Sequence, residues 1–179
     1  MIWDSRGKNY LDHLDEDNVC SVCEGHFDSL GNLEHVGGLS ICTVYMLMIY
    51  NKHKISHMER HIECYGCYRM FKTFPHMILH LENGGCESDI TTQDLYMTAT
   101  QCYQAHKYTD RNYQIDMLNG EDLEELYADT VFPFQCPECD GDFSTLSGLL
   151  QHASSQTCEQ TLQAGAIGKL VKWLDKQYR

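Results

Sequence analysis

The chain has 179 residues, a formal net charge of −13 at pH 7, ten cysteines and ten histidines. This excess of acidic residues argues against a protein that coats phosphates, because sequence-independent DNA affinity comes from Lys and Arg side chains that replace counterions. Six of the cysteines fall in three Cys-x2-Cys pairs, a spacing typical of metal sites.

The N-terminal residues MIWDSRGKNYLDHLDEDN lack a basic stretch followed by an apolar core, so we expect no secretory signal peptide. An intracellular compartment, nucleus or cytoplasm, keeps thiols reduced and free to bind metal. The apolar run 39–50, LSICTVYMLMIY, is shorter than the roughly 20 residues that a membrane-spanning helix needs. We therefore expect neither secretion nor association with a membrane.

Residues 18–61 begin as a metal site and then lose the pattern. Cys20 and Cys23 form the first cysteine pair, and Phe27 and Leu33 follow at spacings suited to a small core. His35 comes two positions after Leu33 rather than three, so it points about 100° away from the ligand face of a helix. As written, no ligand follows the cysteine pair at helical spacing.

Omission of residues 36–52 restores a complete pattern, Cys-x2-Cys-x12-His-x3-His, with His53 and His57 as the last two ligands. We hypothesise that 36–52 is a translated short intron, since valine codons begin with GT and one lysine codon ends with AG. The alternative is a genuine inserted loop, which costs little closure entropy and still lets Cys20, Cys23, His53 and His57 meet around zinc.

Two later segments, 64–86 and 136–158, align without a gap as CYGCYRMFKTFPHMILHLENGGC and CPECDGDFSTLSGLLQHASSQTC. Both read Cys-x2-Cys-x3-Phe-x5-apolar-x2-His-x5-Cys, which makes them an internal repeat. A tetrahedral zinc takes four ligands, two from a hairpin knuckle and two from the end of a short helix. The predicted ligands are Cys64, Cys67, His80 and Cys86 in one copy and Cys136, Cys139, His152 and Cys158 in the other.

Each copy also supplies a Phe and an apolar helix residue for a small core beside the metal. A unit of about 25 residues is too small to fold by burial alone, so we expect zinc to contribute on the order of 10 kcal/mol or more to its stability. Gly84 and Gly85 are expected to end the first helix in left-handed conformations and to turn Cys86 back to the metal.

Five histidines fall off the ligand pattern and are expected to be surface or helix residues: His13, His26, His61, His76 and His106.

These segments resemble Cys2His2-type zinc fingers in their Cys2HisCys variant, and the run from Cys64 to Asp140 also resembles fungal multi-finger proteins of unassigned role. The resemblance implies a ββα fold for each finger and zinc as the metal. We therefore expect a small α+β protein with zinc fingers at 18–61, 62–88 and 134–158, an acidic helical connector at 89–133 and an amphipathic C-terminal helix at 159–179.

Because 49 residues separate Cys86 from Cys136, we expect the last two fingers to fold independently. The predicted connector is acidic, because residues 87–133 carry ten Asp or Glu against two Lys or Arg. Leu95, Thr98, Cys102 and Tyr103 lie at helical spacing and predict a half-buried helix. The tail, with Leu162, Ile167, Leu170, Val171, Leu174 and Tyr178 on roughly one side of a helix, is expected to dock on the last finger or on the connector.

A finger that reads DNA places about four helix side chains in the major groove, where Arg or Lys to guanine is the commonest specific contact. None of the equivalent positions here is Arg or Lys; they are Ser29, Gly31, Asn32 and His35 in the first finger, Thr73, Pro75, His76 and Leu79 in the second, and Thr145, Ser147, Gly148 and Gln151 in the third. We therefore expect DNA affinity weaker than about 10⁻⁶ M at physiological salt.

Two hypotheses for function stay open at this point. One is a nucleic-acid-binding or regulatory adaptor, and the other is a protein-interaction module in which zinc is purely structural. An enzyme with a small-molecule substrate is not expected, because four protein ligands close each site and leave no position for water. The chain as written is expected to bind two zinc ions, and three if residues 36–52 are absent.

Overall fold

A computed structural model of the chain describes residue 55 and residues 58–127, 130–155 and 158–179. Cys20, Cys23, His53 and His57 lie outside the described residues, as does the insert 36–52, so the first metal site stays a prediction. Residues Arg60–Arg179 form one compact unit.

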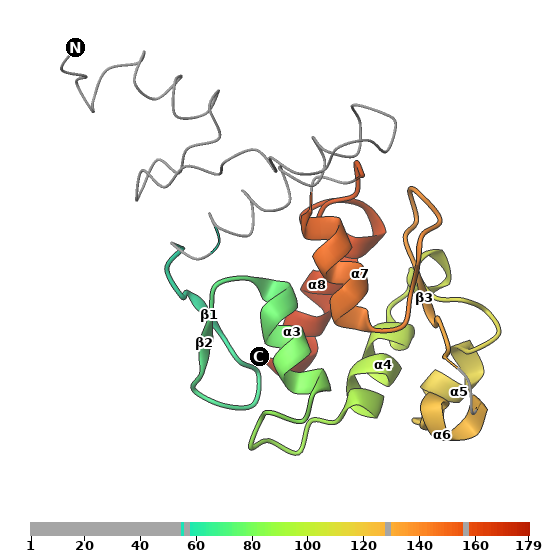
Figure 1. The fold of residues 1–179 in the computed structure, drawn as a ribbon, viewed down its shortest axis with the longest axis horizontal. Helices are drawn as coiled ribbons and strands as arrows, with labels where there is room; N and C mark the ends of the chain where they lie inside the picture. The colour runs from blue at the N-terminus through green and yellow to red at the C-terminus, as the bar shows by residue number, and fades with distance from the viewer. Residues whose placement is uncertain (1–54, 56–57, 128–129, 156–157) are drawn as a thin grey trace, which may run out of the picture. The chain divides into compact units, whose positions relative to one another are not determined.

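The two copies of the repeat have the same local structure. In the first, which we call the 64–86 module, β1 (Ile62–Glu63) pairs with β2 (Met70–Phe71), and α3 (Phe74–Glu82) follows (Figure 1). Thr73 is the extended N-cap of α3, and Pro75 in the first turn needs no backbone N–H there. The apolar face of α3 is buried through Met77, Ile78 and Leu81.

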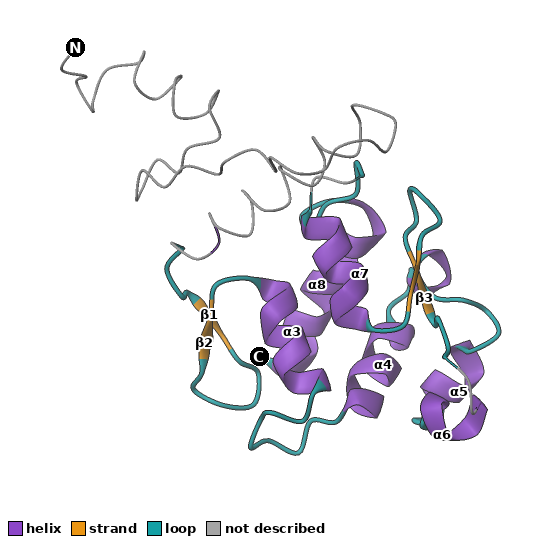
Figure 2. Ribbon diagram, viewed as in Figure 1, coloured by secondary structure: helices purple, strands orange, loops and turns teal. Residues whose placement is uncertain are grey.

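In the second copy, the 136–158 module, β3 (Phe134–Gln135) pairs with β4 (Asp142–Phe143), and α7 (Leu146–Ser154) follows. Thr145 caps α7, because its side-chain oxygen accepts a hydrogen bond of 3.1 Å from Gly148 N. Two short antiparallel hairpins and a set of helices make a small mixed structure, which is compatible with the α+β class that we expected (Figure 2).

The connector contains α4 (Thr92–Gln101), the 3₁₀ turn η1 (Ala105–Lys107), α5 (Gln114–Leu118) and α6 (Leu123–Tyr127). A capping box joins Thr91 and Asp94 at the start of α4. Leu95, Thr98 and Cys102 are buried as their spacing predicted, but Tyr103 is exposed because α4 ends at Gln101.

The connector also joins the hairpin of the 136–158 module. Asp110 N donates to Pro133 O at 3.0 Å, and Gln135 N donates to Tyr108 O at 2.9 Å, so residues 108–110 run alongside β3. Tyr108 is fully buried, and its hydroxyl donates to Ala99 O at 2.8 Å. This part of the connector is therefore built into the core of the unit.

The C-terminal helix α8 (Gly165–Tyr178) packs against α4 and η1, with Ile167, Leu170 and Leu174 fully buried. Trp173 Nε1 donates to Thr98 O at 2.8 Å. The helix also contacts the 64–86 module, which its sequence did not predict. The ring of Tyr178 stacks on that of Tyr65 with centroids 5.2 Å apart, and Tyr65 OH donates to Asp175 Oδ1 at 2.8 Å.

The two modules share one core, which argues against the expectation that they fold independently. Helices α3 and α7 pack directly against each other (Figure 1). One cluster of buried hydrophobic side chains continues from α3 through α4 and α7 to α8. The length of the connector does not keep the modules apart, because a long connector can fold back and bring its ends together at little extra entropic cost.

A carboxylate completes the contact between the modules. Glu82, the last residue of α3, accepts hydrogen bonds from Leu146 N at 2.8 Å and from Ser147 N at 3.2 Å, the first N–H groups of α7. These groups have no partner within their own helix, and the positive end of the helix dipole favours an anion there. Burial nevertheless raises the pKa of Glu82, although these hydrogen bonds and one with Tyr96 act to lower it.

Replacement of Glu82 by Ala is expected to lower the free energy of unfolding by about 1 to 3 kcal/mol, because it leaves backbone N–H groups without an acceptor. Because the pKa of Glu82 is raised in the fold, the native state holds this proton more tightly than the unfolded state. The free energy of unfolding therefore increases as the pH falls from above the raised pKa of Glu82 in the native state to the pKa of this carboxyl in the unfolded chain. Glu82→Gln keeps an acceptor oxygen and should remove this pH dependence.

Denaturant unfolding of the zinc-loaded chain at several pH values measures both effects. Glu121→Ala, which removes an exposed acidic side chain, is the matched control and should change stability by less than about 0.5 kcal/mol. Equal effects of Glu82→Ala and Glu121→Ala would mean that the Glu82 contact does not hold the modules together.

Candidate metal centres

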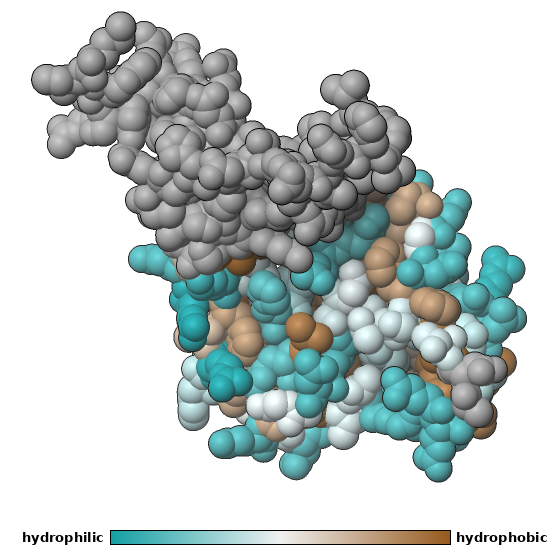
Figure 3. Space-filling model, viewed as in Figure 1, coloured by the Kyte–Doolittle hydropathy of each residue, from teal (hydrophilic) through white to brown (hydrophobic). Residues whose placement is uncertain are grey.

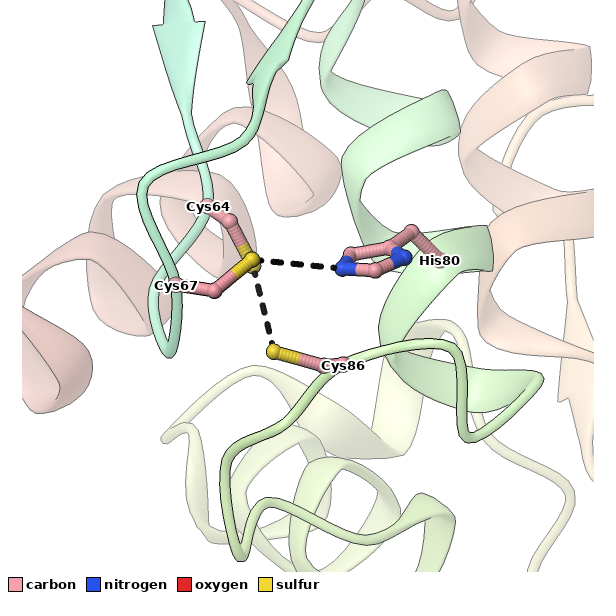
Figure 4. Close-up of side chains that lie close together, drawn as sticks. All are labelled: Cys64, Cys67, His80 and Cys86. Atoms are coloured by element: carbon pink, nitrogen blue, oxygen red, sulfur yellow. Dashed lines mark hydrogen bonds between the residues drawn. The ribbon is translucent and has the colours of Figure 1, made fainter.

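The four predicted ligands of the 64–86 module lie together (Figure 4). Cys64 and Cys67 stand in the turn between β1 and β2, and Cys64 N donates to Arg69 O at 2.9 Å, which closes this turn. His80 projects from the last turns of α3, and Cys86 follows the end of that helix. The side chains point toward one another from three separate parts of the module.

Two glycines return the chain from α3 to Cys86, for different reasons. Gly84 has φ +62°, a left-handed conformation that ends the helix, as expected. Gly85 does not have a positive φ, so the expectation of a left-handed conformation at this residue is wrong. Gly85 is needed for space instead, because a Cβ there would lie 3.0 Å from Nδ1 of His80.

The distances between ligand atoms suit a tetrahedral zinc ion. Cys64 Sγ lies 3.7 Å from Cys86 Sγ, and Cys67 Sγ lies 3.5 Å from His80 Nε2. With Zn–S near 2.3 Å and Zn–N near 2.0–2.1 Å, tetrahedral geometry sets two sulfurs about 3.8 Å apart and a sulfur and a nitrogen about 3.5 Å apart. The four donor atoms all lie within 4.8 Å of one another, and the thiols are free rather than paired in disulfides.

The 136–158 module repeats this arrangement with Cys136, Cys139, His152 and Cys158. Cys136 Sγ lies 3.8 Å from Cys158 Sγ, while His152 Nε2 lies 3.3 Å from Cys139 Sγ and 3.0 Å from Cys158 Sγ. Cys136 N donates to Gly141 O at 2.8 Å, the same bond that closes the first knuckle. Both copies of the repeat therefore build one cluster of three sulfurs and one nitrogen.

An aromatic ring supports the histidine in each cluster. The ring centroids of Phe71 and His80 are 5.0 Å apart, as are those of Phe143 and His152, and the interplanar angles are 35° and 39°. The phenylalanine of the repeat thus has the role that we predicted, a small core beside the ligands. It also limits the rotation of the imidazole, so that Nε2 stays directed at the sulfurs.

Burial shifts the pKa of ligands in both clusters. It raises the pKa of Cys64 and of Cys136 to about 11, so each thiolate needs a nearby positive charge to form. It also lowers the pKa of His80, with a smaller contribution from Arg69, and that of His152. Neutral imidazoles with a free lone pair and thiols that ionise beside a cation are the forms that bind zinc.

A residue two positions after the last cysteine supports that ligand, and sequence reasoning missed it. Ser88 Oγ donates to Cys86 Sγ at 3.1 Å, and in the other module Gln160 N donates to Cys158 Sγ at 3.4 Å. Burial acts to raise the pKa of Cys86, but the hydrogen bonds from Ser88 and from the other two cysteines outweigh it and lower that pKa. The hydroxyl of Ser88 was an available signal in the first copy, whereas Gln160 acts through its backbone N–H, which no residue type encodes.

Those histidines off the ligand pattern that the structure describes are not part of either cluster. His61 and His106 are exposed, and His76 shares a hydrogen bond of 2.8 Å with Thr73 Oγ1 at the start of α3. His13 and His26 lie outside the described residues. Buried Cys102 stands apart from both clusters.

Comparisons of the chain with protein-family models, with curated proteins and with solved structures found no match. Within the described residues, none of the helices has both the length and the apolar character that crossing a bilayer requires. The two Cys3His clusters are thus the features that bear on function, and their donor set fits zinc.

Proposed function

We propose that the 64–86 and 136–158 modules are tandem ββα zinc fingers in Cys2HisCys form, and that each holds one structural Zn²⁺. The observation that carries the proposal is the spacing of the cysteine sulfurs, 3.7 Å in one cluster and 3.8 Å in the other, which matches tetrahedral zinc. Four protein ligands close each site, so no position is open for water or substrate. The zinc therefore serves stability rather than catalysis.

The zinc-loaded unit is proposed to act as an adaptor that binds another protein, rather than as a reader of DNA sequence. In α7, Ser147 is buried beside Glu82, and the Thr145 side chain caps the helix. In α3, Pro75 is buried, and Thr73 is engaged with His76. Four of the eight positions that face the groove in a DNA-reading finger are therefore used for packing or capping here, while Leu79 and Gln151 are exposed.

Nucleic-acid binding remains the second candidate, and one surface favours it. Lys169, Lys172 and Lys176 are exposed along α8. Their number is small, and Arg179 at the same end is paired with Asp175 at 3.2 Å. Because non-specific affinity grows with the number of phosphates neutralised, so few basic side chains support weak binding.

Native mass spectrometry of the full chain tests the zinc assignment. We expect two zinc ions, both lost on treatment with a chelator, because two clusters have uninterrupted ligand spacing. A third tightly held ion would show that Cys20, Cys23, His53 and His57 also bind metal and that the insert is tolerated. A chain that folds with no zinc would overturn the proposal.

Binding to random DNA and RNA tests the choice between the two roles. We expect affinities weaker than about 10⁻⁶ M at physiological salt. Replacement of Lys169, Lys172 and Lys176 by Gln should abolish whatever binding appears at low salt. Nanomolar binding to a duplex selected from a random pool, with protection of bases in the major groove, would restore the role of DNA reader.

A further inference from the structure

The end of the connector exposes a concentration of large apolar side chains. Ile115 on α5 is 70% exposed, Leu126 on α6 is 53% exposed, and Phe132 is 47% exposed. Large apolar groups that gather on a surface mark an interaction site more often than single ones do. We call this set of residues the connector surface; its members are Ile115, Leu118, Leu126, Tyr127 and Phe132.

These residues are not displaced core residues. Met117, Leu123 and Val131 from the same segments are buried and already supply the connector's contribution to the core. Met117 lies against α4, where Thr100 Oγ1 contacts its sulfur at 3.7 Å. Ile115, Leu126 and Phe132 therefore add little to folding of the described unit, and their apolar character fits a role at the surface.

Contacts of α5 and α6 with each other and with α4 hold these two short helices in place. The rings of Tyr113 and Tyr127 meet edge to face with centroids 5.1 Å apart, and Tyr127 OH donates to Asp116 Oδ2 at 2.6 Å. Gln93 Nε2 on α4 donates to Asp122 Oδ2 at 2.9 Å, which ties the turn between α5 and α6 to the core. The surface is thus pre-organised, which lowers the entropic cost of binding.

Acidic side chains lie in the same segments of the chain as these apolar ones. Residues 110–127 carry six Asp or Glu and one Arg. Glu121, Asp122, Glu124 and Glu125 are all exposed, on α6 and in the turn before it. Figure 3 shows hydrophilic surface with small apolar areas at the edge of the unit where Figure 1 places α5 and α6.

We propose that the connector surface binds a basic amphipathic helix of a partner protein. The apolar face of such a helix covers Ile115, Leu118 and Leu126, and its Lys or Arg side chains pair with the acidic residues of the same segments. A nucleic acid does not fit this surface, because its phosphates would meet carboxylates. The inference rests on the proposed adaptor role and names the class of partner that the adaptor recognises.

A synthetic helical peptide with Leu on one face and Lys on the other is the probe, titrated against the zinc-loaded full chain. Two matched peptides are the controls: one has Glu in place of Lys, and one has Ser in place of Leu. We expect measurable binding of the Leu/Lys peptide and at least tenfold weaker binding of each control, since both the apolar and the charged contacts are needed. Hydrogen exchange should report protection at 114–127.

Variants locate the binding site. Ile115→Ser combined with Leu126→Ser, and separately Glu124→Gln combined with Glu125→Gln, should each weaken binding about tenfold or more. Leu79→Ser combined with Tyr103→Ser removes exposed apolar side chains elsewhere and should leave binding unchanged. Equal losses in both apolar pairs, equal binding of the Ser peptide, or protection only outside 114–127 would overturn the proposal.

The zinc content of each sample separates this inference from the proposed function. A chain that holds two zinc ions and does not bind the Leu/Lys peptide refutes the connector surface alone. A chain that folds without zinc refutes the zinc-finger assignment, whatever its peptide binding. RNA that competes with the peptide at 114–127 would identify the surface as a nucleic-acid site and would also refute the inference.

Discussion

Chelation of zinc from the full chain is expected to unfold residues 60–179 as one unit. The strands have two residues each, and the two finger helices have nine residues each, too short to be stable in isolation. Structural zinc contributes on the order of 10 kcal/mol or more per site, while a whole domain is stable by only about 5 to 15 kcal/mol. Loss of both ions therefore exceeds what the shared core can supply.

Hydrogen exchange with and without chelator checks this expectation segment by segment. Protection should be lost together in α3, α7 and α8, because these helices share one core. Addition of zinc should restore it, which controls for irreversible damage. Persistent protection of α4 and α8 in the metal-free chain would show that the connector and the C-terminal helix fold without the fingers.

Replacement of Cys136 by Ala is expected to disrupt both modules, although it removes a ligand from only one cluster. Without zinc, the hairpin and α7 of the 136–158 module lose their main stabilisation. Helix α3 then loses the surface of α7 on which it packs, and Glu82 loses the N–H groups that it caps. Zinc affinity at Cys64, Cys67, His80 and Cys86 should fall as well.

Cys102→Ala is the matched control, because Cys102 is also a buried cysteine but lies outside both clusters. It should cost about 1 to 3 kcal/mol, as ordinary core substitutions do, and leave two zinc ions bound. Native mass spectrometry and exchange in α3 distinguish the variants. If Cys136→Ala loses one zinc ion while α3 keeps wild-type protection, the modules are independent in spite of their shared core.

We expect zinc binding in one module to affect zinc binding in the other because contacts at both ends of the unit join the two modules. Glu82 joins the end of α3 to the start of α7. Helix α8, which follows Cys158, reaches the knuckle of the other module through the stacked rings of Tyr178 and Tyr65. Zinc bound in one module thus stabilises elements that support the other, and loading of the two sites should be cooperative.

The sequence was enough to predict the eight ligands of the two described clusters because the four ligands of each cluster lie close together in the chain. The spacing between Cys64 and Cys67 sets a knuckle, and the spacing from His80 to Cys86 sets one helix end and a turn. Few backbone arrangements bring such ligands together, and the same spacing in a second copy made the interpretation specific. The structure places each set of four within 4.8 Å.

The tertiary structure alone decided how the modules are combined. Packing of α3 on α7, the position of Glu82 at the start of α7 and the contact of Tyr65 with α8 join residues 64 to 113 positions apart in the chain. No local pattern encodes such contacts, because an apolar helix face shows that it is buried but does not show against what. For the same reason, the periodicity of the connector could not distinguish Met117, which is buried, from Ile115, which faces solvent.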